Sequence, residues 1–237
     1  MNLLKNTTVI IPAKNENIGI KICIELIFMF VPQVKEIIIV LESEIDSSIG
    51  FIKQATINKD ASVRTIINQQ SPGVTGSILT GINQSFGKYI LIYPADEINP
   101  IFNLSLMLSK LDEGYDLVSA TRYSKGGLRL GIGAVSGNIL SRLLSFLVYS
   151  VSKGKFSDIS TGIKAFNKEN VYIPAKPLSQ HGWSFPMEIE LNAIKAKKRI
   201  TEVPIISVDR PFGGKSSYIA RVWLIDYLKV SLKILLS

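Results

Sequence analysis

Acidic residues directly after an apolar run are the first sign of chemistry in this chain. Residues 90–93 are apolar and favour a β-strand, Pro94 ends the run because it has no N–H to donate, and Asp96 and Glu97 follow. The chain has one histidine and one cysteine, which excludes a zinc site built from several such residues. Any metal must therefore be held mainly by oxygen ligands, which indicates Mg²⁺ or Mn²⁺.

Polar residues follow two other apolar runs in the same way. Residues 7–12 and 34–41 are compact runs rich in β-branched residues, which are typical of buried strands. The polar residues that follow these two runs are Lys14, Asn15, Glu16, Glu42, Ser43 and Asp46. Ligands of a parallel sheet bind beyond the carboxyl ends of its strands, so we expect these residues to share one rim with the acidic turn. The alternative is coincidence, because loops are polar in general.

Helical patterns separate these runs and predict the frame that positions them. The expected helices of the first half are residues 18–30, 49–57 and 77–86, and a third strand is expected at 63–67. The order β-α-β-α-β-α-β predicts an α/β fold with a parallel, doubly wound sheet. In the second half we expect strands at 116–120 and 200–208 and helices at 138–151, within 181–199 and at 218–236.

Length and composition limit the class of protein. The 237 residues suffice for one large domain, and no apolar stretch approaches the roughly 20 residues of a membrane-spanning helix. The apolar run begins directly after Lys5, so we expect no signal peptide. The single cysteine, Cys23, fits a reducing cytosol and a place in the core. The net charge of +8 suits phosphorylated substrates, an anionic membrane or nucleic acid. Nucleic acid does not explain the acidic rim, so we expect no nucleic-acid partner.

The common phosphate-binding motifs are missing. The stretch "GINQSFGK" has the wrong spacing for a P-loop and precedes a strand, and "GIGAVSG" lies too late in the chain for a dinucleotide fingerprint. A bound nucleotide would therefore depend on the acidic rim and a metal.

Several segments, in order, resemble one family. "VIIPAKNE", "IIIVLESEIDSS" and "GKYILIYPADEINP" are similar to the first, second and metal-binding strands of family 2 inverting glycosyltransferases of the GT-A fold. "TRYSKGG", "SDISTGIKAF" and "ITEVPIISVDRPFGGKSS" resemble the branch that contains dolichol- and polyprenyl-phosphate mannose synthases. The resemblance covers residues 7–217 and implies one GT-A domain, a Rossmann-like, mostly parallel sheet with helices on both faces.

The resemblance also implies roles for the donor side. The residues in positions that hold the nucleotide are Pro12, Ala13, Asn15, Glu16 and Glu42. Asp96, with Glu97 as a second candidate, would hold Mg²⁺ or Mn²⁺ against the donor diphosphate. Two acids of the family pattern are absent, because Leu41 and Pro94 occupy their positions.

On the acceptor side the resemblance points to basic residues and one acid. Arg122, Arg210 and Lys215, with the Ser216 hydroxyl, would contact the phosphates of the lipid or the donor. Asp158 matches an acid near the reaction centre and is the candidate general base if the acceptor is a hydroxyl. If the acceptor is a lipid phosphate, no base is required. An arginine of the pattern is replaced by Ile132.

The implied activity is transfer of a sugar from a UDP- or GDP-linked donor to a polyprenyl phosphate or a glycan hydroxyl, with inversion, in cell-envelope, polysaccharide or glycolipid synthesis. The tail at 218–237 suits a helix lying on a membrane surface, so we expect a cytoplasmic protein at the membrane face; a helix covering the core is the alternative. An inactive membrane-surface binding protein and a sugar-nucleotide nucleotidyltransferase are the competing functions.

Overall fold

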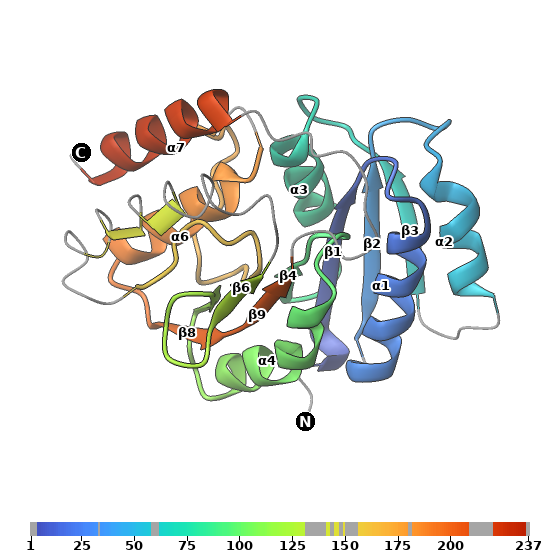
Figure 1. Cartoon of the computed structure of the whole chain (residues 1–237), viewed down its shortest axis with the longest axis horizontal. Coiled ribbons are helices and arrows are strands. Elements are labelled where there is room, and N and C mark those ends of the chain that lie inside the picture. The colour runs from blue at the N-terminus through green and yellow to red at the C-terminus, as the bar shows by residue number, and fades with distance from the viewer. Residues whose placement is uncertain are drawn as a thin grey trace.

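A mixed sheet of seven strands forms the centre of the computed structural model (Figure 1). The model describes residues 4–32, 34–57, 62–130, 141–142, 145–146, 149, 156–179, 182–208 and 220–235. The strands are β1 (Thr7–Ala13), β2 (Glu36–Leu41), β3 (Ser62–Ile67), β4 (Tyr89–Ile92), β5 (Leu117–Thr121), β7 (Lys164–Asn167) and β8 (Ile200–Pro204). Their order across the sheet is β3-β2-β1-β4-β7-β5-β8.

The direction of the strands places the ends of β1, β2, β4 and β5 at the same edge. β1 pairs in parallel with β2 and β4, and β5 pairs in parallel with β8. The exception is β7, which is antiparallel to both of its neighbours, β4 and β5. The parallel sheet expected for the first half is confirmed, whereas the antiparallel β7 was not predicted.

Helices cover both faces of the sheet because its strands are apolar on both sides. One face packs against α1 (Asn17–Phe30), α2 (Ser48–Thr56) and α4 (Leu104–Asp112), and the other packs against α3 (Val74–Asn83) and α6 (Ser184–Lys195). Successive β1 residues point to opposite layers: Ile11 lies in the first core and Ile10 in the second. The expected α/β class is thereby confirmed.

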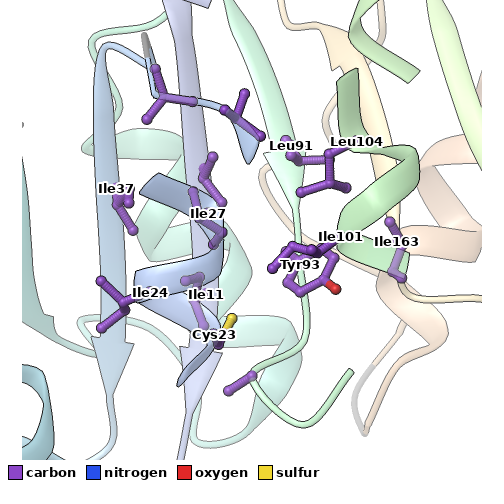
Figure 2. Close-up of a cluster of buried hydrophobic side chains, with 14 of the residues drawn as sticks. Ile11, Cys23, Ile24, Ile27, Ile37, Leu91, Tyr93, Ile101, Leu104 and Ile163 are labelled. Atoms are coloured by element: carbon purple, nitrogen blue, oxygen red, sulfur yellow. The ribbon is translucent and has the colours of Figure 1, made fainter. Parts of the chain in front are cut away.

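The larger core contains the single cysteine. Figure 2 shows Cys23 and Ile27 of α1 next to Ile11 of β1, with Tyr93 and Leu104 on the other side of the same cluster. Burial raises the pKa of the Cys23 thiol, so the thiol is inert and the residue belongs to the core, as expected.

Two strands lie outside the main sheet. β6 (Leu128–Leu130) and β9 (Ile206–Val208) form a small parallel sheet of their own. The single strand expected at 200–208 was wrong, because Pro204 has no N–H and ends the β8 ladder. Ile205 then bridges the two sheets: its N–H donates to the Thr121 carbonyl (2.8 Å) and its carbonyl accepts from Leu128 N–H (3.0 Å).

The remaining elements are two short 3₁₀ helices and the tail helix. η1 (Leu4–Asn6) precedes β1, and η2 (Asn99–Asn103) leads from the acidic turn into α4, a helix that the sequence reading did not predict. α7 (Ala220–Leu235) lies along α6 (Figure 1). Of the helix expected at 138–151 the structure describes only parts, and residues 141–142, 145–146 and 149 are helical. No helix among the described residues is long and apolar enough to cross a membrane.

Candidate active site

The turns after β1 and β2 are joined by hydrogen bonds at the carboxyl edge of the sheet. Both carboxylate oxygens of Asp46 accept from the Asn15 N–H, at 3.2 and 3.1 Å, and Oδ1 also accepts from the Ser48 N–H at 2.8 Å. Asn15 has a φ of 56°, in the left-handed region that asparagine tolerates better than most residues. The first two polar clusters therefore share one rim, as expected, and Asp46 fixes the turn that carries Asn15.

Glu42 fixes the loop on the other side of this rim. Its Oε1 accepts from the Asn68 amide (3.0 Å), the Gly73 N–H (3.2 Å) and the Ser77 hydroxyl (2.9 Å). Gly73 has a φ of 105°, which favours glycine, and it is the residue before α3. Glu42 thus connects the end of β2 to the start of α3.

The other predicted nucleotide-binding residues lie at the end of β1 and in the turn that follows it. Pro12 and Ala13 are the last residues of β1 and are buried, and the Glu16 N–H donates to the Ser48 hydroxyl at 2.9 Å. The structure therefore gathers all five residues of this set, Pro12, Ala13, Asn15, Glu16 and Glu42, at the ends of two neighbouring strands.

The acidic turn follows β4, the neighbour of β1. Tyr93 is fully buried and its hydroxyl donates to the backbone carbonyl of Glu97, which fixes the path of the turn. The Glu97 carboxylate accepts from the Ser207 hydroxyl of β9 at 2.8 Å, and both Asp96 and Glu97 are partly buried. Ser207 lay in a predicted strand, with no signal that it would reach this turn.

The residues of this turn fit a divalent ion that is only partly held by protein. No group of three or more Asp, Glu, His or Cys side chains that could hold a metal gathers among the described residues. Asp96 offers carboxylate oxygens at the strand ends, which are suitable donors for Mg²⁺ or Mn²⁺. Mg²⁺ commonly binds through one or two carboxylates and the phosphates of a substrate, so a ligand diphosphate would have to complete such a site.

The end of β5 carries a buried ion pair. The Arg122 guanidinium binds the Asp158 carboxylate through two bonds, Nε to Oδ2 (2.7 Å) and Nη2 to Oδ1 (2.9 Å), and the Arg122 N–H also donates to Oδ2 (3.1 Å). Ser160 adds its N–H (3.2 Å) and hydroxyl (2.9 Å) to Oδ1. Burial alone would raise the pKa of Asp158, but the charge and hydrogen bonds of Arg122 lower it. Asp158 is therefore a weak base, and its carboxylate is held in place by Arg122.

A second buried pair lies behind the first. Lys164 of β7 and Glu190 of α6 form an ion pair with no exposed side-chain surface, and Lys164 also donates to the Ser119 hydroxyl at 2.6 Å. Desolvation raises the pKa of Glu190 to about 7 although Lys164 opposes this shift. Lys164 also helps to lower the pKa of Asp158. No sequence pattern indicated this pair, because a buried charge looks like any surface charge until its partner is known.

An aromatic ring extends the basic end of the site. The guanidinium carbons of Arg122 and Arg142 lie 5.3 and 5.1 Å from the Tyr123 ring centre, within cation–π distance. The Tyr123 hydroxyl and the Ser141 hydroxyl are 2.7 Å apart. Arg142 was missed because it belongs to no motif and lies in a mostly apolar segment.

The acidic turn and the basic end lie at the same edge of the sheet, after β4 and β5, with β7 between these two strands. Burial lowers the pKa of Arg122, but the charge and hydrogen bond of Asp158 raise it, and the Glu97 carboxylate adds to this rise. Three further predicted residues, Arg210, Lys215 and Ser216, lie outside the described residues.

Residues 8–172 match the model of the family described as glycosyl transferase family 2. An undecaprenyl-phosphate 4-deoxy-4-formamido-L-arabinose transferase of Yersinia enterocolitica is 24% identical over 213 residues, which is 89% of this chain and 62% of that protein. Its Yersinia pestis counterpart is 22% identical over 222 residues, 92% of this chain and 64% of that one. The chain therefore spans somewhat less than two thirds of these relatives.

Solved structures show the same fold. Glucosyl-3-phosphoglycerate synthase of Mycobacterium tuberculosis, in complex with Mn²⁺, UDP and glucosyl-3-phosphoglycerate, superposes with a TM-score of 0.70 at 17% identity over 97% of this chain and 79% of that one. The same enzyme with Mg²⁺ and UDP gives a TM-score of 0.69 at 16% identity, again over 97% and 79%. These likenesses confirm the expected GT-A fold. Since the family model covers more than half of its length, the chain belongs to glycosyl transferase family 2.

Proposed function

We propose that this chain transfers a sugar from a UDP- or GDP-linked donor to a polyprenyl phosphate, with inversion at the anomeric carbon. The observation that carries the choice of acceptor is the state of Asp158, which is fully buried and bound by three hydrogen bonds from Arg122 and two from Ser160. A hydroxyl acceptor needs a general base, and a carboxylate with a lowered pKa and occupied oxygens is a poor one. A phosphate acceptor is already ionised and needs none.

The names of the Yersinia relatives, which are undecaprenyl-phosphate transferases, support this acceptor class. In the reaction, an oxygen of the lipid phosphate attacks the anomeric carbon from the face opposite the donor diphosphate. The bond from that carbon to the diphosphate oxygen breaks, and the nucleoside diphosphate leaves with the electron pair. No proton has to be removed, and one attack on the opposite face inverts the configuration.

The rim formed by β1, β2 and β4 is the proposed donor site. Pro12, Ala13 and Asn15, with Glu16 and Glu42, would surround the nucleoside. Asp96, with Glu97 as a second candidate, would hold Mg²⁺ or Mn²⁺ together with the diphosphate. A bound ion of this kind neutralises the charge that develops on the leaving diphosphate.

The basic residues would bind the phosphates. Arg122 offers a planar guanidinium that is held in one orientation by Asp158, and Arg142 adds a second positive charge across the Tyr123 ring. By their place in the matching segments, Arg210, Lys215 and Ser216 are proposed to take part, Lys215 and Ser216 on the donor phosphates.

Helix α7 is the proposed contact with the membrane. Tyr227, Val230 and Ile234 pack on α6, so this helix covers part of the core. Its outward side exposes two large apolar residues and two lysines, namely Ile225, Leu232, Lys229 and Lys233. Such a surface suits the cytosolic face of an anionic membrane, where the polyprenyl phosphate is found. Binding to vesicles with and without anionic lipid would test this part of the proposal.

A transfer assay with two lipids tests the proposed function. The protein is incubated with Mn²⁺ and radiolabelled UDP- or GDP-sugars in detergent, and label in the lipid extract is measured with undecaprenyl phosphate or with undecaprenol. We expect one nucleotide sugar to label undecaprenyl phosphate and leave undecaprenol unlabelled. Label in undecaprenol, or in neither lipid with any donor, would overturn the proposal; in the second case the inactive binding protein becomes the better account.

A further inference from the structure

Glu202, on the edge strand β8, is bonded to the segment that carries Asp158. Its Oε1 accepts from two consecutive backbone N–H groups, those of Ser157 (2.8 Å) and Asp158 (3.1 Å). Its Oε2 accepts from the Ser157 hydroxyl at 2.8 Å. One carboxylate therefore satisfies three donors of a turn that has no regular secondary structure of its own.

The same network reaches the residue before Arg122. The hydroxyls of Ser157 and Thr121 are 2.6 Å apart, and Thr121 is the last residue of β5. β5 and β8 are paired, with Glu202 opposite Ser119 and Pro204 opposite Thr121. Glu202 thus fixes both sides of the Arg122–Asp158 pair: the strand end that carries the arginine and the turn that carries the acid.

We infer that Glu202 is a positioning residue for the acceptor phosphate, acting through Ser157 and Asp158 on the orientation of the Arg122 guanidinium. This inference rests on the proposed function and adds to it a residue that does not touch the substrate. The Arg122 guanidinium is held in one orientation, because two of its nitrogens bind the two oxygens of Asp158. A turn released from Glu202 loses the acceptor of two backbone N–H groups at once, so the Asp158 carboxylate moves and Arg122 moves with it.

Two substitutions separate the hydrogen bonds of Glu202 from its negative charge. In Glu202→Gln the amide oxygen still accepts from the Ser157 and Asp158 N–H groups. The amide NH₂ can donate to the Ser157 hydroxyl, which then donates to Thr121, since either hydroxyl of that pair can be the donor. Glu202→Ala removes the three bonds that the carboxylate accepts. A positioning role therefore predicts that glutamine restores what alanine loses.

The experiment measures transfer and binding in the wild type, in Glu202→Ala and in Glu202→Gln. With the wild type active on undecaprenyl phosphate, Glu202→Ala should raise the KM for that lipid about tenfold, which corresponds to roughly 1.4 kcal/mol, while the KM for the nucleotide sugar stays within about twofold. Glu202→Gln should stay within about threefold of the wild type in both constants. Calorimetric titration with farnesyl phosphate, a short soluble probe, should show the same order of affinities without any turnover.

Glu188→Ala is the matched control. Glu188 also accepts two consecutive backbone N–H groups, those of Leu178 (2.9 Å) and Ser179 (2.8 Å), and it contacts neither Asp158 nor Arg122. It should lower the melting temperature as much as Glu202→Ala does and leave the acceptor KM unchanged. Ser157→Ala, which removes only the Oε2 bond and the contact with Thr121, is the milder variant if Glu202→Ala does not fold; it should raise the acceptor KM about threefold.

The outcomes are separable. A wild type that transfers no sugar and binds no farnesyl phosphate overturns the proposed function itself. An active wild type whose acceptor KM and farnesyl phosphate affinity are unchanged in Glu202→Ala or Ser157→Ala overturns the positioning role. Equal losses in donor and acceptor constants, or in Glu188→Ala, reduce Glu202 to a residue of general stability and also overturn it.

Discussion

The proposed donor and acceptor sides of the site are built differently. On the donor side, the carboxylates of Asp46 and Glu42 accept hydrogen bonds from neighbouring loops. Asp96 lies partly exposed in the turn after β4. On the acceptor side, Arg122 and Asp158 are buried and bound to each other, with Ser160 satisfying the same carboxylate. On the proposed acceptor side the charged groups are thus already paired with each other, whereas the proposed metal site on the donor side would be completed by a ligand diphosphate.

The difference explains how the family pattern could change on one side. A metal held jointly by protein and diphosphate can be bound with one carboxylate fewer, so proline at position 94 does not by itself remove the site. A buried ion pair has no such tolerance, because loss of one partner leaves the other charged and desolvated. Replacements should therefore cost more at β5 than at β1 and β2.

The largest effect is expected at Arg122. Arg122→Ala leaves Asp158 buried without its partner, which should lower the free energy of unfolding by about 3–5 kcal/mol and abolish transfer to the lipid phosphate. Urea unfolding of the wild type and of Arg122→Ala measures the loss in free energy of unfolding. The exposed pair of Lys88 and Glu169 is the control, and Glu169→Ala should leave the free energy of unfolding nearly unchanged. Equal losses in the two variants would contradict the contrast between buried and exposed charge.

A smaller effect is expected at Asp46 on the donor side. Asp46→Ala removes the acceptor of two N–H groups, that of Asn15 in the turn after β1 and that of Ser48 at the start of α2. This loss should lower the free energy of unfolding by about 1–2 kcal/mol. Nucleotide affinity should fall with it, because Asn15 loses its position, while the affinity for farnesyl phosphate should not change. A loss confined to the acceptor would show that the two sides are wrongly assigned.

The smallest effect concerns the pH dependence of stability and depends on Glu190. Its pKa in the folded protein is raised to about 7 by burial, so the folded state binds this proton more tightly than the unfolded state does. The resulting stability is complete below the unfolded pKa and is lost as the pH rises through about 7. In Glu190→Gln the contribution of this carboxyl disappears, so the stability of the wild type relative to the variant should fall between about pH 4.5 and 7, in addition to the cost of leaving Lys164 with a neutral partner. If the melting temperatures of the wild type and Glu190→Gln change in parallel over this pH range, the burial argument is contradicted.

The sequence predicted the donor side better than the acceptor side, for a physical reason. Apolar runs such as 7–12 and 34–41 are buried on both faces and are followed by polar turns, so periodicity alone indicated both the strands and the rim. The same reasoning missed β7, because its Lys164 is buried only through its pair with Glu190 of a later helix. It also joined β8 and β9 into one strand, since a proline at position 204 is compatible with a strand end as well as with an edge strand.

Partners distant in the chain were beyond the reach of patterns. Glu202 and Ser157 are separated by 45 residues, and Ser207 and Glu97 by 110. Each of these bonds depends on how β8 and β9 lie beside β5 and the acidic turn. The residues of the Arg122–Asp158 pair were singled out from motifs, but their mutual ion pair, which changes the role of Asp158, became visible only in the fold.

One set of titrations tests most directly the claim that the acceptor side is complete and the donor side is finished by metal and nucleotide. UDP, GDP and farnesyl phosphate are each titrated into the wild type and Asp96→Ala, with and without Mn²⁺. We predict that one nucleotide binds only with Mn²⁺ and only to the wild type, and that farnesyl phosphate binds both proteins without the metal. Nucleotide binding that is the same without Mn²⁺ or in Asp96→Ala would contradict the claim.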